Sequence, residues 1–185
     1  IKLAGIELTV IGEENISEGP VLYIGNHRSF FDVPITYPRC PIRTGYIAKK
    51  EMEKVPLLST WMKRLHCLFL DRNDLKQGLK TILTAIEKVK SGISICIFPE
   101  GTRSKMGNEM LEFKGGSFKA ATKAKCPIVP VALKNCFVPF DSNTVRPVTV
   151  EVHFLDPIPY EEYQGMKTTE IAEMVKKRIE AVVTA

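Results

Sequence analysis

The sequence predicts an α/β domain with a largely parallel sheet flanked by helices. Short runs of β-branched and apolar residues alternate along the chain with longer segments of helical periodicity. Turn residues bound these runs, as in Glu18-Gly19-Pro20 and Ser91-Gly92. In sheets of this kind, ligands bind where strands end and loops begin.

The length and composition are those of one globular domain. The chain has 185 residues, of which 44% are hydrophobic and 25% charged, and this excludes a disordered chain, a collagen, a coiled coil and a polytopic membrane protein. We therefore expect a single domain over residues 1–185. No apolar stretch reaches the roughly 20 residues that span a bilayer, and no signal peptide is recognisable. Because the chain begins at Ile1 rather than Met, we expect that an N-terminal membrane segment is absent from it.

Seven strands and four helices are expected from the local patterns. The strands are Ile6–Ile11, Val21–Gly25, Gly45–Ala48, Cys67–Leu70, Ile93–Phe98, Ile128–Leu133 and Val148–Phe154. The helices are Leu57–Leu65, Asp74–Lys90, Ser117–Lys125 and Thr168–Val183. In Asp74–Lys90 the apolar positions form one stripe of Leu75, Leu79, Ile82, Leu83, Ile86 and Val89. Asn73 or Asp74 caps the start of this helix, and Gly92 ends it.

The cysteines and histidines indicate neither a disulfide framework nor a metal site. The five cysteines are odd in number and form no Cys-x-x-Cys pair, which favours a reducing compartment. His27, His66 and His153 are spread along the chain without the spacing of metal ligands. We therefore expect no bound metal.

Polar and titratable residues follow the strand Val21–Gly25. His27 and Asp32 are five residues apart, so their side chains meet only if the chain reverses direction between them. The Asp32 carboxylate would then accept a hydrogen bond from one imidazole nitrogen, which leaves the other free to take a proton from a hydroxyl group. The same residues also fit a loop histidine held by its own aspartate, or a helix with Asp32 at its N-cap.

A second polar group, Phe98–Ser104, follows the strand Ile93–Phe98. The planar guanidinium of Arg103 suits bidentate binding of a phosphate, and Gly101 permits close approach of the backbone. Glu100 can pair with Arg103 or accept a hydrogen bond from a substrate hydroxyl. A tight turn with a surface Glu–Arg pair is the alternative interpretation.

Two further segments carry positive charge next to predicted strand or helix ends. Lys114, Gly115 and Gly116 precede the helix Ser117–Lys125, where backbone N–H groups favour a phosphate or an oxyanion. Arg72 ends the strand Cys67–Leu70 and can reach a phosphate. Alternatively, the two glycines are a flexible entry to the helix, and Arg72 is a surface charge at the end of a strand.

Together and in this order, these segments resemble the lysophosphatidic acid acyltransferase family of glycerolipid acyltransferases. The resemblance covers roughly Gly5 to Ile158. The family's Asn-His-x-x-x-x-Asp block matches Asn26, His27 and Asp32, and its Phe-Pro-Glu-Gly-Thr-Arg-Ser block matches Phe98–Ser104 without a change. An Asp-Arg at a strand end matches Asp71-Arg72, and a Val-Pro-Val-Ala block matches Val129–Ala132.

The resemblance implies a single acyltransferase domain and a reaction. His27, oriented by Asp32, would act as general base on the sn-2 hydroxyl of lysophosphatidic acid, which attacks the thioester of acyl-CoA or acyl carrier protein. The products would be phosphatidic acid and free CoA or carrier protein, with no metal and no further cofactor. The substrate-binding residues it implies are Arg72, Glu100, Gly101, Thr102, Arg103, Lys114, Gly115 and Gly116.

The positive charge of the chain is concentrated in one segment. Lys and Arg number 26 against 21 Asp and Glu, and residues 39–80 alone hold ten basic and four acidic side chains. We interpret some of these lysines as contacts with an anionic membrane surface, on the cytoplasmic face of a membrane. We interpret the apolar stripe of the helix Leu57–Leu65 as part of the core. The basic residues accompany no nucleic-acid recognition motif, so nucleic acid is not an expected partner.

The motifs leave the acceptor and the class of function open. They do not separate lysophosphatidic acid from glycerol-3-phosphate or another lysophospholipid as acceptor. A thioester hydrolase, in which water replaces the acceptor, and a non-catalytic lipid-binding module are hypotheses of a different class.

Overall fold

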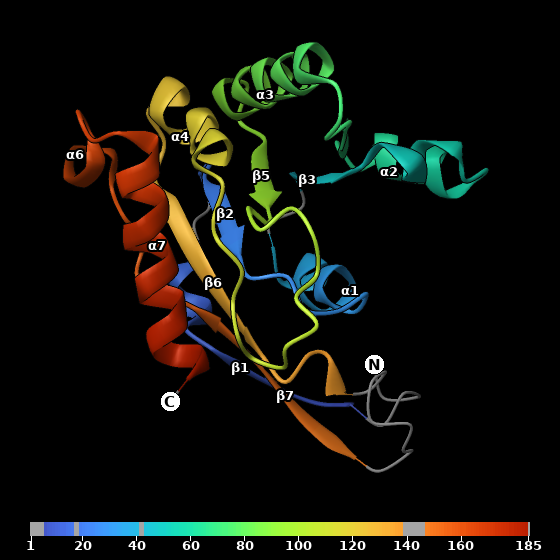
Figure 1. The fold of residues 1–185 in the computed structure, drawn as a ribbon, viewed down its shortest axis with the longest axis vertical. Helices are drawn as coiled ribbons and strands as arrows, with labels where there is room; N and C mark the ends of the chain where they lie inside the picture. Colours follow the sequence, from blue (N-terminus) through green and yellow to red (C-terminus); the bar gives the residue numbers. More distant parts are fainter. Residues whose placement is uncertain (1–5, 17–18, 41–42, 139–146, 185) are drawn as a thin grey trace.

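The structure is a computed structural model, which describes residues 6–16, 19–40, 43–138 and 147–184. Its centre is a seven-stranded sheet with the spatial order β1-β7-β6-β2-β5-β3-β4 (Figure 1). Among the described strands, β6 and β7 form the one antiparallel pair, and the other five pairings are parallel. The predicted fold class is therefore confirmed.

All seven predicted strands are present, each within one residue of its predicted ends. They are β1 (Ile6–Ile11), β2 (Leu22–Gly25), β3 (Thr44–Lys49), β4 (Leu68–Leu70), β5 (Ser94–Ile97), β6 (Ile128–Lys134) and β7 (Val148–Phe154). In β2, β5 and most of β6 the residues on both faces are buried, as expected for the central strands of a covered parallel sheet.

The four predicted helices are also present, together with two short ones. The α-helices are α1 (Asp32–Thr36), α2 (Leu58–Arg64), α3 (Leu75–Lys90), α4 (Lys119–Ala124), α6 (Tyr160–Tyr163) and α7 (Thr168–Val183). Single 3₁₀ turns are η2 (Glu13–Asn15), η3 (Tyr37–Arg39), η4 (Lys50–Lys54) and η5 (Gly115–Phe118). The Asp74 carboxylate accepts hydrogen bonds from the amides of Lys76 and Gln77, so the predicted cap of α3 is confirmed. Among the described residues, no helix is both long and apolar enough to cross a membrane.

The sheet has a hydrophobic core on each face, because alternate strand residues point to opposite sides. Leu22 and Ile24 of β2 belong to the core that α3, α4 and α7 cover. Val21 and Tyr23 belong to the other core, which includes Ile35 of α1 (Figure 1). The carboxyl ends of β2 and β5 are thereby held at one edge of the sheet, where the polar motifs begin.

The face that α3 buries differs from the predicted one. Its buried residues are Thr81, Ala85 and Val89, whereas Leu75, Leu79 and Leu83 are exposed. The small side chains let the helix lie close to the sheet, and the Thr81 hydroxyl donates a hydrogen bond to the carbonyl of Phe69 at 3.1 Å. The predicted stripe was therefore wrong for its three leucines, which extend beyond the contact.

The interpretation of the α2 stripe as core was also wrong. No residue of α2 is buried, and Trp61 is exposed together with Leu57 just before the helix. In Figure 1, α2 lies apart from the other helices, beside the β3–β4 end of the sheet. The short segment between β3 and β4 therefore extends outward instead of packing on the sheet.

Two leucine truncations test this assignment of the core. Leu22→Ala removes a fully buried side chain and is expected to lower the free energy of unfolding by about 2–5 kcal/mol. Leu75→Ala changes a side chain that is 89% exposed and should alter it by no more than about 0.5 kcal/mol. Urea denaturation followed by circular dichroism measures both values. Equal losses for the two variants would contradict the assignment.

Candidate active site

The chain reverses direction directly after β2 and brings His27 against Asp32. The distance from His27 Nδ1 to Asp32 Oδ2 is 2.7 Å, and the Asp32 side chain is fully buried. The same oxygen accepts hydrogen bonds from the backbone N–H groups of Arg28, at 2.7 Å, and Ser29, at 2.9 Å. Asp32 is the first residue of α1 and makes no N-cap bond, because its carboxylate is turned back to the preceding loop. This geometry excludes the N-cap interpretation.

The His27 ring is fixed in both protonation pattern and plane. An ionised carboxylate only accepts hydrogen bonds, so Nδ1 carries the proton and Nε2 keeps a free lone pair. The ring stacks on Phe98, with centroids 4.6 Å apart and planes 16° apart. Gly25 makes this possible, because a Cβ at that position would lie 2.9 Å from the Phe98 ring. The His27 side chain is 22% exposed, so a ligand can reach it.

The Glu100 carboxylate fixes the backbone of His27 by a hydrogen bond. The Glu100 side chain is buried, and its two oxygens accept hydrogen bonds from the N–H groups of His27, at 2.7 Å, and Leu111, at 2.9 Å. Burial raises the pKa of Glu100, although these two hydrogen bonds and the charge of Arg28 act in the opposite direction. Since both oxygens are engaged by the backbone, the geometry favours a positioning role for Glu100 over the predicted contact with substrate.

The long loop from Phe98 to Lys114 is tied across the carboxyl ends of the central strands. The buried guanidinium of Arg28 donates hydrogen bonds to the backbone carbonyls of Asn108, at 2.6 Å, and Glu109. The Ser104 N–H donates to the carbonyl of His27 at 3.0 Å. The loop and the His27 turn are therefore one connected unit.

Three asparagines complete this scaffold. The Asn26 side chain donates to the carbonyl of Leu133 at 2.9 Å and accepts from its N–H at 2.8 Å, which joins the end of β2 to β6. The Asn108 and Asn135 side chains join the long loop to the segment after β6, at 3.2 Å. Sequence reasoning missed Asn26, Arg28 and Asn135 as scaffold residues. The available signal was that Asn26 and Arg28 lie in the polar run around His27.

Besides Glu100, four of the predicted binding residues lie on this loop. Gly101 has a φ of +74°, which glycine adopts without strain, and a Cβ there would lie 3.0 Å from Lys114 Nζ. The structure therefore brings Gly101 and Lys114 together. Thr102 and Arg103 are exposed, and Arg103 directly precedes Ser104, whose N–H bonds to His27.

The two glycines after Lys114 differ in their surroundings. A Cβ at Gly115 would lie 3.1 Å from the backbone nitrogen of Thr169, so this glycine permits contact with the start of α7. Gly116 is exposed and has open space around its Cα. The packing therefore explains Gly115 without a ligand.

Arg72 lies apart from the other predicted binding residues. It follows β4, which is separated from β2 by β5 and β3, so about 14 Å lie between the β2 and β4 axes. Asp71 forms an ion pair with Lys50 at 3.0 Å and shapes the turn, and the Arg72 side chain is exposed. Arg72 is therefore placed to meet only a remote part of a ligand at His27.

The comparisons with known proteins agree with this geometry. Residues 7–134 match the family described as Acyltransferase, a range that includes His27, Asp32 and Phe98–Ser104. The chain belongs to the acyltransferase family.

Named relatives and a solved structure extend the acyltransferase match. The 1-acyl-sn-glycerol-3-phosphate acyltransferase of Saccharomyces cerevisiae is 33% identical over 186 residues, covering 96% of this chain and 60% of that protein. The protein of the same name from Borreliella burgdorferi is 31% identical, covering 97% of this chain and 74% of its own length. The crystal structure of the LPA acyltransferase PlsC from Thermotoga maritima matches with a TM-score of 0.83 and 26% identity, over 99% of this chain and 73% of that one. The chain thus spans about three fifths of the yeast relative.

The cysteines of this acyltransferase are poor nucleophiles. Burial raises the pKa of all five thiols, to about 11 for Cys40 and Cys126. Cys136 lies near Asp32, whose negative charge raises the pKa of that thiol further. Thiolate is therefore scarce at neutral pH, which disfavours a cysteine nucleophile.

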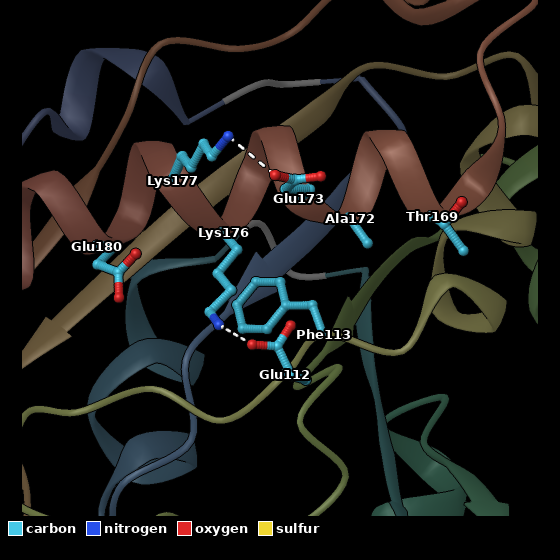
Figure 2. A pocket seen from close by; sticks show the side chains of 8 residues that line it. All are labelled: Glu112, Phe113, Thr169, Ala172, Glu173, Lys176, Lys177 and Glu180. Carbon is cyan, nitrogen blue, oxygen red and sulfur yellow. Dashed lines mark hydrogen bonds and ion pairs between the residues drawn. The ribbon is translucent and has the colours of Figure 1, made fainter.

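Neither a metal centre nor the pocket beside α7 indicates a second site among the described residues. They contain no group of three or more His, Cys, Asp or Glu side chains arranged to hold a metal ion. Figure 2 shows a pocket between α7 and the segment around Phe113, where Lys176 pairs with Glu112 and Lys177 with Glu173. Its lining includes neither His27 nor any predicted binding residue.

The positioning role of Glu100 predicts a stability loss in Glu100→Gln. One carboxylate oxygen is replaced by an NH₂ group, so the N–H of His27 or Leu111 loses its acceptor in a buried place. The free energy of unfolding should fall by about 1–3 kcal/mol, measured by urea denaturation. Glu109→Gln is the matched control, because that residue is exposed and should change stability by no more than about 0.5 kcal/mol. Coincident unfolding curves for the two variants would refute the role.

Proposed function

We propose that this chain transfers a fatty acyl group from acyl-CoA or acyl carrier protein to the sn-2 hydroxyl of lysophosphatidic acid, giving phosphatidic acid. The observation that carries the proposal is the His27–Asp32 pair, with Nδ1 bonded to the carboxylate and Nε2 free in an accessible position. The names of the relatives support the choice of acceptor, since they describe 1-acyl-sn-glycerol-3-phosphate acyltransferases.

In the proposed reaction, His27 first accepts a proton from the acceptor hydroxyl and then donates it to the leaving thiolate. Nε2 takes the proton of the acceptor hydroxyl as that oxygen forms a bond to the thioester carbonyl carbon. Asp32 stabilises the imidazolium that results, because its buried carboxylate lies 2.7 Å from Nδ1. When the carbon–sulfur bond breaks, the thiolate takes the proton from Nε2 and leaves as free thiol. No covalent acyl-enzyme, metal or further cofactor takes part.

The phosphate of the acceptor would bind to the Phe98–Lys114 loop. Four bonds separate the phosphorus of lysophosphatidic acid from its sn-2 oxygen, so the cations that bind it must lie near His27. Arg103 and Lys114 meet this requirement better than Arg72, since their loop is bonded to the His27 turn. The backbone of Gly101 and the hydroxyl of Thr102 border the same region. In this proposal Arg72 and Gly116 contact more remote parts of the substrates.

A lipid acceptor and product place the reaction at a membrane. We infer that the chain works on the cytoplasmic face of a membrane, where acyl-CoA and acyl carrier protein are available. Nucleic acid has no part in this function. The basic segment between residues 39 and 80 supports an anionic lipid surface as the partner.

The His27 mechanism predicts a large loss of turnover in His27→Gln. With lysophosphatidic acid and acyl-CoA as substrates, release of CoA thiol and formation of phosphatidic acid should both fall about 10²–10⁴-fold. His66→Asn is the control, because that histidine lies outside the site and asparagine tolerates its positive φ. Unimpaired turnover of His27→Gln would sink the mechanism, whereas absence of turnover in the unmodified chain would favour a non-catalytic lipid-binding module.

The same assay distinguishes acyl transfer from thioester hydrolysis and identifies the acceptor. Thiol release that does not depend on added acceptor would identify a thioester hydrolase. Equal or better turnover of glycerol-3-phosphate would identify that compound, and not lysophosphatidic acid, as the acceptor.

Recognition of the acceptor phosphate predicts an effect of Arg103→Lys on the KM for lysophosphatidic acid. One ammonium group replaces a planar fork that binds two phosphate oxygens, so KM should rise roughly tenfold. Arg43→Lys, a change at another exposed arginine, should leave KM unaltered. An unchanged KM in Arg103→Lys would assign that residue to the loop structure alone.

A further inference from the structure

The segment that joins β3 to β4 carries an exposed apolar surface. Val55 is 41% exposed, Leu57 87% and Trp61 59%, and the three lie within seven residues of the η4–α2 segment. With the neighbouring cations Lys54 and Arg64 they form what we call the α2 surface. Isolated exposed apolar residues are common, but a cluster that includes tryptophan and leucine marks a contact surface.

The charge around this surface is positive. Residues 49–80 contain eight basic and four acidic side chains, so they hold most of the net charge of +5. Lys49, Lys50 and Lys63 form ion pairs with nearby carboxylates. Within the part of the chain that the structure describes, Lys54 and Arg64 have no carboxylate within 4.0 Å and both are exposed. They remain available to an anionic partner.

The position of α2 favours a broad, flat partner. The helix lies apart from the other helices and beyond the β3–β4 end of the sheet (Figure 1). Val55, Leu57 and Trp61 are exposed, and none of them lines the pockets beside α7. Tryptophan is enriched at membrane–water interfaces, and lysine and arginine are attracted to anionic lipid headgroups.

We propose that the α2 surface docks the enzyme on an anionic lipid bilayer, with Leu57 and Trp61 inserted at the headgroup level. Lys54 and Arg64 bind the lipid phosphates around them. The inference deepens the proposed function, because it rests on a lipid acceptor presented by a membrane.

Docking in this way also brings the active site towards the lipid. The η4–α2 segment leaves the carboxyl end of β3, and β3 is parallel to β5 and β5 to β2. His27 follows the carboxyl end of β2, at the same edge of the sheet. A bilayer in contact with Lys54, Val55 and Leu57 therefore lies near that edge, whereas the later part of the segment returns to the amino end of β4.

The single tryptophan of the chain makes the docking directly measurable. Because Trp61 is the sole tryptophan, its fluorescence reports on the α2 surface alone. Vesicles of phosphatidylcholine with phosphatidylglycerol should shift its emission to the blue, and brominated acyl chains should quench it. Pure phosphatidylcholine vesicles, or high salt, should give a much smaller shift.

Matched variants separate the apolar and the ionic parts. Lys54→Gln combined with Arg64→Gln should lower the partition onto anionic vesicles about 25-fold, and Val55→Ser with Leu57→Ser should reduce it comparably. Lys119→Gln with Lys123→Gln on α4, and Ile11→Ser at the opposite edge of the sheet, are the controls and should bind like the unmodified chain. All replaced side chains are exposed, so circular dichroism should show unaltered folding.

Three results would overturn the proposal. The first is unchanged vesicle binding by the α2 variants. The second is a Trp61 shift that appears without vesicles as protein concentration rises, which means self-association. The third is a shift with acyl carrier protein but not with vesicles, which means that the surface docks an acidic protein.

The proposed function can fail independently of the docking. Turnover of a short-chain lysophosphatidic acid in monomeric solution tests the chemistry alone, and the α2 variants should retain it. Binding of anionic vesicles without any such turnover would reject the acyl transfer and leave the docking supported.

Discussion

The buried carboxylate of Asp32 organises the turn on which the active site depends. A buried charge is costly unless donors surround it, and here one oxygen accepts hydrogen bonds from His27 Nδ1 and from two backbone N–H groups of the same turn. These bonds are possible only when the chain folds back after β2. The hydrogen bonds to Asp32 Oδ2 therefore also orient His27 and leave its Nε2 free.

A second buried carboxylate acts on the same residue from a different strand. Glu100 follows β5 and binds the backbone N–H of His27, whereas Asp32 binds its side chain. Phe98, from the same segment as Glu100, stacks on the imidazole ring. Backbone, ring plane and protonation pattern are thus each set by a separate contact. The proposed role of His27 as general base requires this kind of support, because small displacements from the substrate hydroxyl lower the rate steeply.

The parallel sheet explains why contacts from distant parts of the sequence meet at one place. Neighbouring parallel strands end at the same edge, so the turn after β2 and the loop after β5 are adjacent. Arg28 then fixes that loop through the carbonyls of Asn108 and Glu109. The sheet edge carries the proposed site, while the exposed leucines of α3 and the projecting α2 lie outside the packed core. The hydrogen-bonded turn and loop around His27 are thus separate from the apolar surfaces that remain exposed.

The local sequence determined the strands and the four longer helices, and the acyltransferase motif predicted the His27–Asp32 pairing. Each depends on the spacing of residues close together in the chain, or on a motif whose residue types serve one chemistry. The helices α1 and α6 were missed because four or five residues are too few to show a helical period.

Only the tertiary structure decided which polar and apolar groups are buried. By residue type, Glu100 fits a surface or ligand-binding role, but its oxygens meet two backbone amides that come from separate segments. Arg72 and Arg103 are equivalent by residue type, yet the order of the strands separates Arg72 from His27. For α3, an apolar stripe wider than its contact could not reveal which half faces the sheet. Burial and proximity depend on elements distant in sequence, whereas local spacing reports on each element alone.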